Sequence, residues 1–147
     1  MYILCISFFI FIVEYLCSRL LSGHCGLKNK NMNKIYYLST CDTCKRIISE
    51  LELKEKGFVF QDIKTEKITS AQLEEMKNAV GSYEALFSRI ARKYKELALG
   101  EKSLTENDYN KFILEEYTFL KRPVIFIGKK VFVGNSKAVI ADVKAAL

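Results

Sequence analysis

The segment of residues 35–60 constrains the fold most. Residues 35–38 form a short apolar run, which is typical of a buried strand. From residue 42 apolar side chains recur at helical intervals, with charged side chains on the other face, until Gly57. Residues 58–60 are again short and apolar. A strand, a helix and a second strand in this order predict a parallel βαβ unit, because parallel strands need a long crossover connection.

Three helical segments follow this unit, and we expect them over residues 73–80, 83–97 and 109–117. The first and third are preceded by Thr69 and Thr105, each at the start of a capping pattern that is typical of a helix N-terminus.

Residues 124–127 and 131–133 flank a tight turn, which predicts a β-hairpin. A last helix then runs to residue 147, with a cap at Asn135 or Ser136. A parallel strand pair continued by an antiparallel hairpin predicts an α/β fold of the thioredoxin/glutaredoxin-like type. We expect a mixed four-stranded sheet, with the middle helices inserted as a lobe beside it.

Composition and charge narrow the class of protein. The chain has 147 residues, of which half are apolar and about a quarter charged, so it can form one domain with a real core. The formal net charge is +6, but the basic residues are scattered and form no block of five. Such a charge fits an anionic small substrate or simple solubility as well as nucleic acid. We expect a monomer that does not bind nucleic acid directly.

Residues 1–31 are expected to be a separate hydrophobic extension. Their first apolar run is interrupted at Glu14, is too short to span a bilayer, and lacks the positive start of a secretory signal. Residues 32–34 directly precede the first predicted strand and begin with Met32, as a natural translation start would. This indicates that residues 1–31 are an upstream extension of the reading frame, with a membrane anchor or a cleaved signal as alternatives. We assign the domain to residues 32–147 and expect it in the cytoplasm, or anchored facing the cytoplasm if residues 1–31 are made.

Two cysteines, Cys41 and Cys44, stand where the first strand becomes the first helix. The N–H groups at a helix N-terminus are unpaired and carry partial positive charge, so they stabilise a thiolate. Lys45 and Arg46 add to this positive field. Cys41 is the natural nucleophile. Cys44, one turn into the helix, is placed to attack a mixed disulfide and release the partner as a thiol.

A cysteine pair can also bind a metal or pack in a core. A zinc site needs four ligands, yet the single histidine, His24, and the remaining cysteines lie in the extension, so we expect no bound metal. Two buried packing cysteines are a second alternative, since free cysteine is often part of a core. A C-x-x-C pattern that opens a βαβ unit is a specific redox signal, and it favours thiol chemistry.

Residues 34–147 resemble the glutaredoxin-coupled arsenate reductase and Spx family. The segment "IYYLSTCDTCKR" resembles the strand and catalytic cysteine loop of that family. The segment "ALFSRIARKYKEL" resembles its middle helices, and "FLKRPVIFIGKKVFVGN" resembles its Arg-Pro segment and hairpin.

The resemblance implies that Cys41 attacks an oxyanion such as arsenate, whose oxygens are held by Arg122 with Arg89. It also implies that the Arg122–Pro123 peptide bond is cis. It implies no bound cofactor, with glutathione and glutaredoxin or thioredoxin as the reductant. The expected partners are therefore a thiol reductant protein and a small oxyanion substrate.

The sequence departs from the arsenate reductases at three points. Ser88, with Arg89 beside it, stands near the position of their middle arginine, and residues 133–135 contain no arginine after the hairpin. Those reductases also commonly lack a second cysteine, which this chain has in Cys44. The first hypothesis is a thiol-dependent oxidoreductase of the arsenate reductase family. The alternative is an Spx-like redox-sensing regulator that binds RNA polymerase through a C-x-x-C switch.

Overall fold

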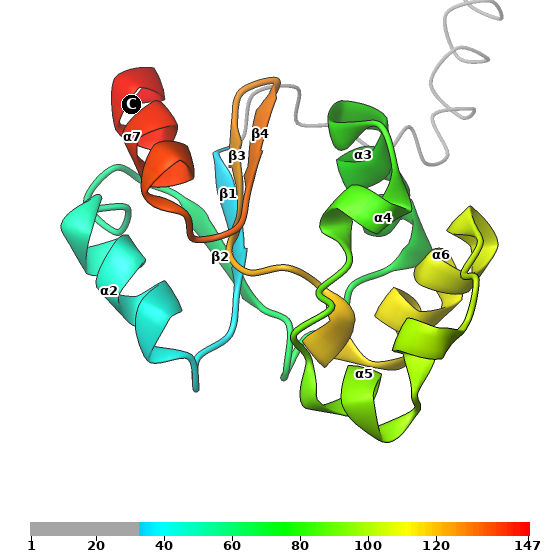
Figure 1. Ribbon diagram of the computed structural model, residues 1–147. Coiled ribbons are helices and arrows are strands. Elements are labelled where there is room, and N and C mark those ends of the chain that lie inside the picture. Colours follow the sequence, from blue (N-terminus) through cyan, green and yellow to red (C-terminus); the bar gives the residue numbers. More distant parts are fainter. Residues whose placement is uncertain (1–32) are drawn as a thin grey trace, which may run out of the picture.

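A four-stranded mixed sheet forms the centre of the computed structural model, which describes residues 33–147 (Figure 1). The strands are β1 (Lys34–Tyr37), β2 (Val59–Asp62), β3 (Val124–Ile127) and β4 (Lys130–Val133). Their order across the sheet is β2-β1-β3-β4. β1 and β2 are parallel, while the other two pairings are antiparallel, so the predicted mixed sheet is confirmed. The extension predicted over residues 1–31 lies outside the described residues.

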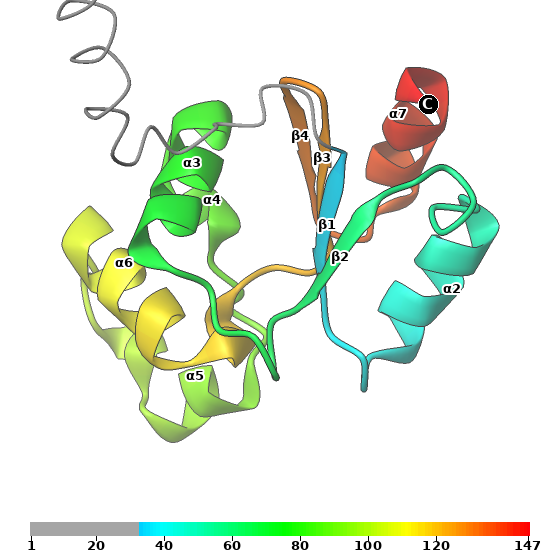
Figure 2. The ribbon, with the colours of Figure 1, turned by 180° about the vertical axis from the view of Figure 1, so that it is seen from behind.

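Helices cover both faces of this sheet (Figures 1 and 2). One face carries α2 (Asp42–Glu50) and α7 (Lys137–Ala146). The other face carries a helical lobe, whose elements are α3 (Ser70–Val80), α4 (Tyr83–Leu86), α5 (Arg92–Glu96), η1 (Leu99–Glu101), α6 (Glu106–Glu115) and η2 (Tyr117–Phe119). None of the helices within residues 33–147 is both long enough and apolar enough to cross a membrane.

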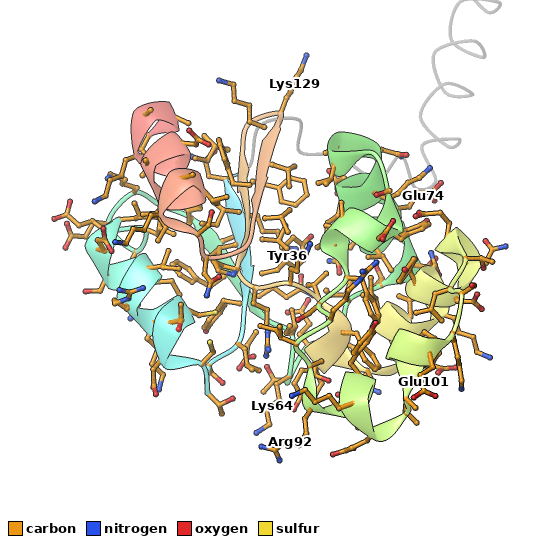
Figure 3. All side chains as sticks on the ribbon, in the orientation of Figure 1. Tyr36, Lys64, Glu74, Arg92, Glu101 and Lys129 are labelled. Carbon is orange, nitrogen blue, oxygen red and sulfur yellow. The ribbon has the colours of Figure 1, made fainter. Side chains whose placement is uncertain are left out.

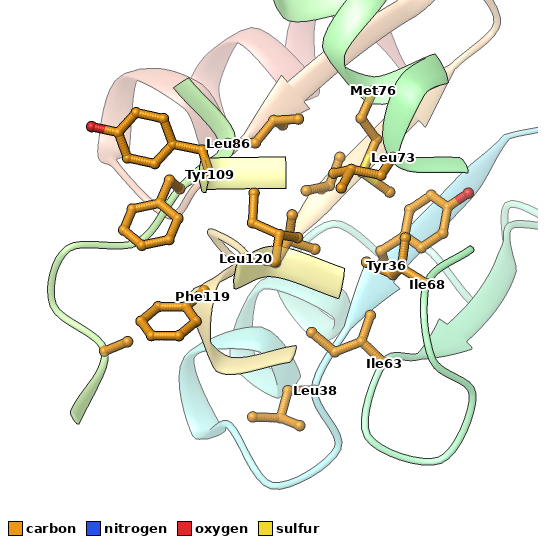
Figure 4. Packing of buried hydrophobic residues seen from close by; sticks show 14 of the residues in the cluster. Tyr36, Leu38, Ile63, Ile68, Leu73, Met76, Leu86, Tyr109, Phe119 and Leu120 are labelled. Carbon is orange, nitrogen blue, oxygen red and sulfur yellow. The ribbon is translucent and has the colours of Figure 1, made fainter. Parts of the chain in front are cut away.

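Alternation along the central strands divides the core between the two faces. In β1, Ile35 packs with the apolar sides of α2 and α7, while Tyr36 packs with the lobe. In β3, Ile125 faces α2 and α7, and Val124 faces the lobe. This follows from the two-residue period of a strand, in which successive side chains point to opposite faces. Figure 4 shows the lobe-side cluster, with Tyr36 beside Ile68.

The predicted helix over residues 83–97 is wrong as a single element. It is divided into α4 and α5, and Phe87 between them forms a β-bridge with Leu120. The Ser88 N–H donates to the Phe119 carbonyl over 2.7 Å, and the rings of Phe87 and Phe119 stack with centroids 5.0 Å apart. Burying this aromatic pair requires an extended backbone at residue 87, and this tertiary contact outweighs the local helical pattern.

The helix boundaries follow their capping chemistry more closely than their apolar pattern. Thr69 and Thr105 each form a complete capping box at the N-terminus of α3 and α6, as expected. The first helix, in contrast, ends at Glu50 rather than at Gly57. Glu52 has a left-handed backbone with φ of 53°, so the chain continues to Gly57 in turns.

Candidate active site

A tight turn at the end of β1 positions Cys41. Its N–H donates to the Leu38 carbonyl over 3.0 Å, and its extended backbone makes it the N-cap residue of α2. The adjacent loop is tied to the neighbouring strand, because the Ser39 N–H donates to Asp62 Oδ1 over 3.4 Å. Cys41 is therefore fixed at the carboxyl end of β1, half-buried, with its sulfur at the start of a helix.

The surroundings of Cys41 favour its thiolate. Burial acts to raise the pKa of this thiol, but four interactions outweigh it. They are hydrogen bonds from the backbone N–H and from the thiol of Cys44, the positive charge of Arg122, and a hydrogen bond from the backbone N–H of Thr43. The pKa of Cys41 therefore lies below its ordinary value. The partial positive charge at the N-terminus of α2 acts in the same direction, because Cys41 is the N-cap residue of that helix.

Cys44 has the opposite character. It is completely buried in the first turn of α2. Burial raises its pKa to about 11, and the neighbouring Cys41 sulfur contributes to the rise. At neutral pH the Cys44 thiol keeps its proton and donates a hydrogen bond to Cys41. The two cysteines are both free thiols, so the structure shows the reduced form of the pair.

Arg122 approaches the same thiols from the segment that enters β3. The Arg122–Pro123 peptide bond is cis, as the resemblance implied. Hydrogen bonds on both sides hold this segment: the Lys121 N–H donates to the Leu86 carbonyl over 2.8 Å, and the Gly134 N–H donates to the Pro123 carbonyl over 2.9 Å. The lobe and the end of β4 thus fix Arg122 beside the cysteine loop.

Cys41, Arg122 and Arg89 all line one open groove of ≈ 850 Å³. The groove lies between the N-terminus of α2, the segment from Ser82 to Ile90, and residues 133–136 after β4. Three cations line it, Arg89, Lys121 and Arg122, against the single carboxylate of Glu84. The groove is therefore electropositive, which suits an anionic or thiolate-bearing ligand. Cys44 and Pro123 lie behind its surface.

The second predicted arginine, Arg89, is not free to act alone. Its guanidinium forms an ion pair with Glu84 and lies 3.5 Å from the Tyr109 hydroxyl. Lys121 is also engaged, because its Nζ donates to the Ala85 carbonyl over 2.8 Å. Of the three groove cations, Arg122 is the one whose charge acts on Cys41. The structure therefore places Arg89 and Arg122 in one groove with Cys41, but only Arg122 is available to act on the thiol.

Sequence reasoning did not identify Glu84 or Lys121 as parts of the site. Glu84 lies five residues before Arg89, a spacing that places two side chains on different faces of a regular helix. The two meet because the helix is interrupted at Phe87. The position of Lys121 next to Arg122 in the sequence could have indicated that it belongs to the site. Within residues 33–147, no three or more His, Cys, Asp and Glu side chains gather as a potential metal site.

We expect Arg122→Met to raise the pKa of Cys41, because the charge that favours the thiolate is removed. The thiolate is lost as pH falls through the folded-state pKa, so the variant should react several-fold more slowly near pH 7. At a pH above the Cys41 pKa of both proteins, the wild type and the variant should react at similar rates. The rate of Cys41 alkylation by iodoacetamide against pH measures this. Lys121→Met is the matched control, and an equal effect there would contradict a specific role of Arg122.

The chain was compared with known proteins. The ArsC family model matches residues 36–143. Among solved structures, the YffB protein is 24% identical, with a TM-score of 0.68 over 79% of this chain and 99% of that one. An arsenate reductase from Vibrio cholerae is 17% identical, with a TM-score of 0.65 over 81% of this chain and 100% of that one.

An ArsC-related protein from Brucella melitensis is 25% identical, with a TM-score of 0.59 over 73% of this chain and 89% of that one. No match was found among curated protein sequences. The structural likenesses establish the thioredoxin-like fold, and the family model covers most of the sequence, including both cysteines and the Arg-Pro segment. The chain therefore belongs to the ArsC family.

Proposed function

We propose that the protein is a thiol-dependent oxidoreductase in which Cys41 attacks and Cys44 resolves. The observation that supports this most is the opposite pKa shift of two hydrogen-bonded thiols at one helix N-terminus. The thiolate is the form of cysteine that attacks, and a lowered pKa increases its fraction at neutral pH. A neighbouring thiol that stays protonated does not compete with it. The substrate is a disulfide or an arsenate-like oxyanion.

In the first step the Cys41 thiolate attacks one sulfur of a disulfide, and the other sulfur leaves as a thiolate. With arsenate the same thiolate attacks arsenic, and a protonated oxygen leaves as water. Arg122 lies beside Cys41 and steadies the negative charge that develops there. The product in each case is a covalent adduct on Cys41.

The second step depends on Cys44 losing its proton. The charge on Cys41 is one cause of the raised Cys44 pKa, and the adduct removes that charge. Cys44 therefore becomes easier to deprotonate only after Cys41 has reacted. Its thiolate then attacks the Cys41 sulfur, forms the Cys41–Cys44 disulfide, and releases a thiolate, or arsenite from the arsenic adduct. The protein gives up two electrons, which a thiol reductant, glutathione with glutaredoxin or thioredoxin, returns.

A redox-sensing regulator that binds RNA polymerase is the second candidate. The observation in its favour is the same hydrogen-bonded pair, since two thiols in contact within one helical turn also suit a disulfide switch. Arg89 is paired with Glu84, so Arg122 is the groove cation whose charge acts on Cys41, and one such cation favours disulfide chemistry over arsenate reduction.

Turnover tests the proposal. Purified protein is given arsenate, or separately bis(2-hydroxyethyl) disulfide, with glutathione, glutaredoxin and glutathione reductase or with thioredoxin and its reductase, and the rate without the protein is subtracted. Consumption of NADPH is followed against protein concentration. We expect turnover with the disulfide and slower or no turnover with arsenate. Failure with both substrates, together with capture of purified RNA polymerase, would favour the regulator instead.

A further inference from the structure

An exposed apolar side chain stands at the rim of the groove. Ile90 is 90% exposed, although isoleucine is among the residue types most often buried. Its neighbours Ser88 and Ala91 are buried, so the backbone is held while Ile90 points outward. Ile90 lines the same groove as Cys41. An apolar group held outward beside a reactive thiol is suited to contact a partner rather than the core.

Cations extend from this rim along the lobe. Arg92 and Lys95 are exposed on α5, and within residues 33–147 neither of them forms an ion pair. Lys93 on the same helix is paired with Glu116. Figure 3 shows Arg92 at the edge of the molecule, away from Lys129 at the hairpin tip. Helix α5, close to Ile90 in the chain, therefore carries a net positive charge with Glu96 as its one carboxylate, which complements an acidic partner.

The groove is larger than an inorganic oxyanion requires. Its volume of ≈ 850 Å³ lies in the upper part of the range of about 300–1,000 Å³ that is typical of sites for organic ligands. Residues 133–136, after β4, also line it. A groove of this volume can hold a short peptide segment, whereas a tetrahedral anion fills only a small part of it.

We propose that the groove binds a cysteine-bearing peptide segment of another protein, with an apolar residue against Ile90 and acidic residues against Arg92 and Lys95. The proposal rests on the thiol chemistry proposed above and names its substrate class. The Cys41 thiolate attacks the sulfur of a peptide cysteine held in a disulfide, and the second sulfur leaves as a thiolate. Cys44 then attacks Cys41, and the peptide leaves as a thiol.

The test uses two synthetic peptides, each with its cysteine in a mixed disulfide with thionitrobenzoate. The first carries leucine and two glutamates around the cysteine, and the second carries lysines in place of the glutamates. Release of thionitrobenzoate is followed by absorbance. We expect the acidic peptide to react about tenfold faster at low salt, with the difference shrinking as salt screens the charges. Bis(2-hydroxyethyl) disulfide serves as a small probe that cannot reach the rim.

Two variants locate the surface. Ile90→Ser should slow the acidic peptide about fivefold, as expected for one lost apolar contact, without changing the small probe. Arg92→Glu should reduce the preference for the acidic peptide. Leu97→Ser and Lys129→Glu are matched controls, since Leu97 is also exposed and apolar and neither residue lines the groove. Both controls should react like the wild type with either peptide.

The outcomes separate this proposal from the one on which it rests. If both peptides react equally, and Ile90→Ser and Arg92→Glu behave as the wild type while the small probe is turned over, the peptide surface is overturned and the thiol chemistry stands. If neither the peptides nor the small probe reacts with Cys41, both proposals are overturned. A preference for the acidic peptide that is lost in Arg92→Glu but kept in Lys129→Glu supports the surface.

Discussion

Replacing Cys41 with serine should lower the rate of disulfide exchange by more than about 10³-fold, because a hydroxyl at this position does not ionise near neutral pH. Cys44 cannot substitute for it. The Cys44 side chain is completely buried and its pKa is raised to about 11, so it is both inaccessible and protonated. NADPH consumption with bis(2-hydroxyethyl) disulfide measures the loss.

The fold of this variant should be retained, since serine is smaller than cysteine and is a favoured N-cap residue for α2. Thermal unfolding by circular dichroism provides the control. Thr43→Ser, which changes the adjacent groove residue without touching a thiol, is the matched variant and should remain active. Turnover by Cys41→Ser within tenfold of the wild-type rate would show that another group is the nucleophile.

Cys44→Ser should stop the reaction after its first step. Cys41 keeps Arg122 and the backbone N–H groups of residues 43 and 44, so its attack on a disulfide should be slowed only a few-fold. Within residues 33–147 no second thiol then remains to release the partner. We expect the wild type to form the Cys41–Cys44 disulfide and this variant to accumulate a stable adduct at Cys41. Peptide mass spectrometry after a single addition of disulfide distinguishes the two products.

Two outcomes would exclude a resolving role of Cys44. If Cys44→Ser turns over at the wild-type rate with glutathione, the adduct on Cys41 is released by the external thiol and Cys44 has no resolving role. If the wild type never shows the mass of an internal disulfide, both the resolving function and the switch function of Cys44 are excluded. Ser49→Ala, on the exposed side of α2, is a control for general effects on this helix.

The sheet and the cysteine loop could be predicted from the sequence because their signals are local. Ile35 and Ile125 belong to short apolar runs, and the order of those runs leaves few ways to build one sheet. The place of Cys41 at a helix N-terminus follows from the change of apolar spacing after residue 42. Prediction of the mixed four-stranded sheet therefore needed no information beyond pattern and connection length.

The lobe could not be predicted to the same depth. Residues 83–97 have helical spacing, yet Phe87 leaves the helix to stack on Phe119, a residue 32 positions later. Spacing within a segment carries no information about such a partner. The same break in the helix brings Glu84 to Arg89. The arginine that was predicted to hold an oxyanion therefore forms an ion pair with a carboxylate of the protein. Cys41, Arg89 and Arg122 line one groove, but the charge balance of that groove depends on this tertiary contact.

The central claim is that Cys41 is the thiol that ionises first and attacks, while Cys44 stays protonated at neutral pH. Its most direct test is the pH dependence of iodoacetamide alkylation of the reduced protein, read site by site through peptide mass spectrometry. The account predicts that Cys41 reaches half of its maximal rate below about pH 8.5, the ordinary pKa of a free cysteine, and that Cys44 stays unlabelled until far more alkaline pH. Half-maximal labelling of Cys41 above that pH, or labelling of Cys44 before Cys41, would contradict it.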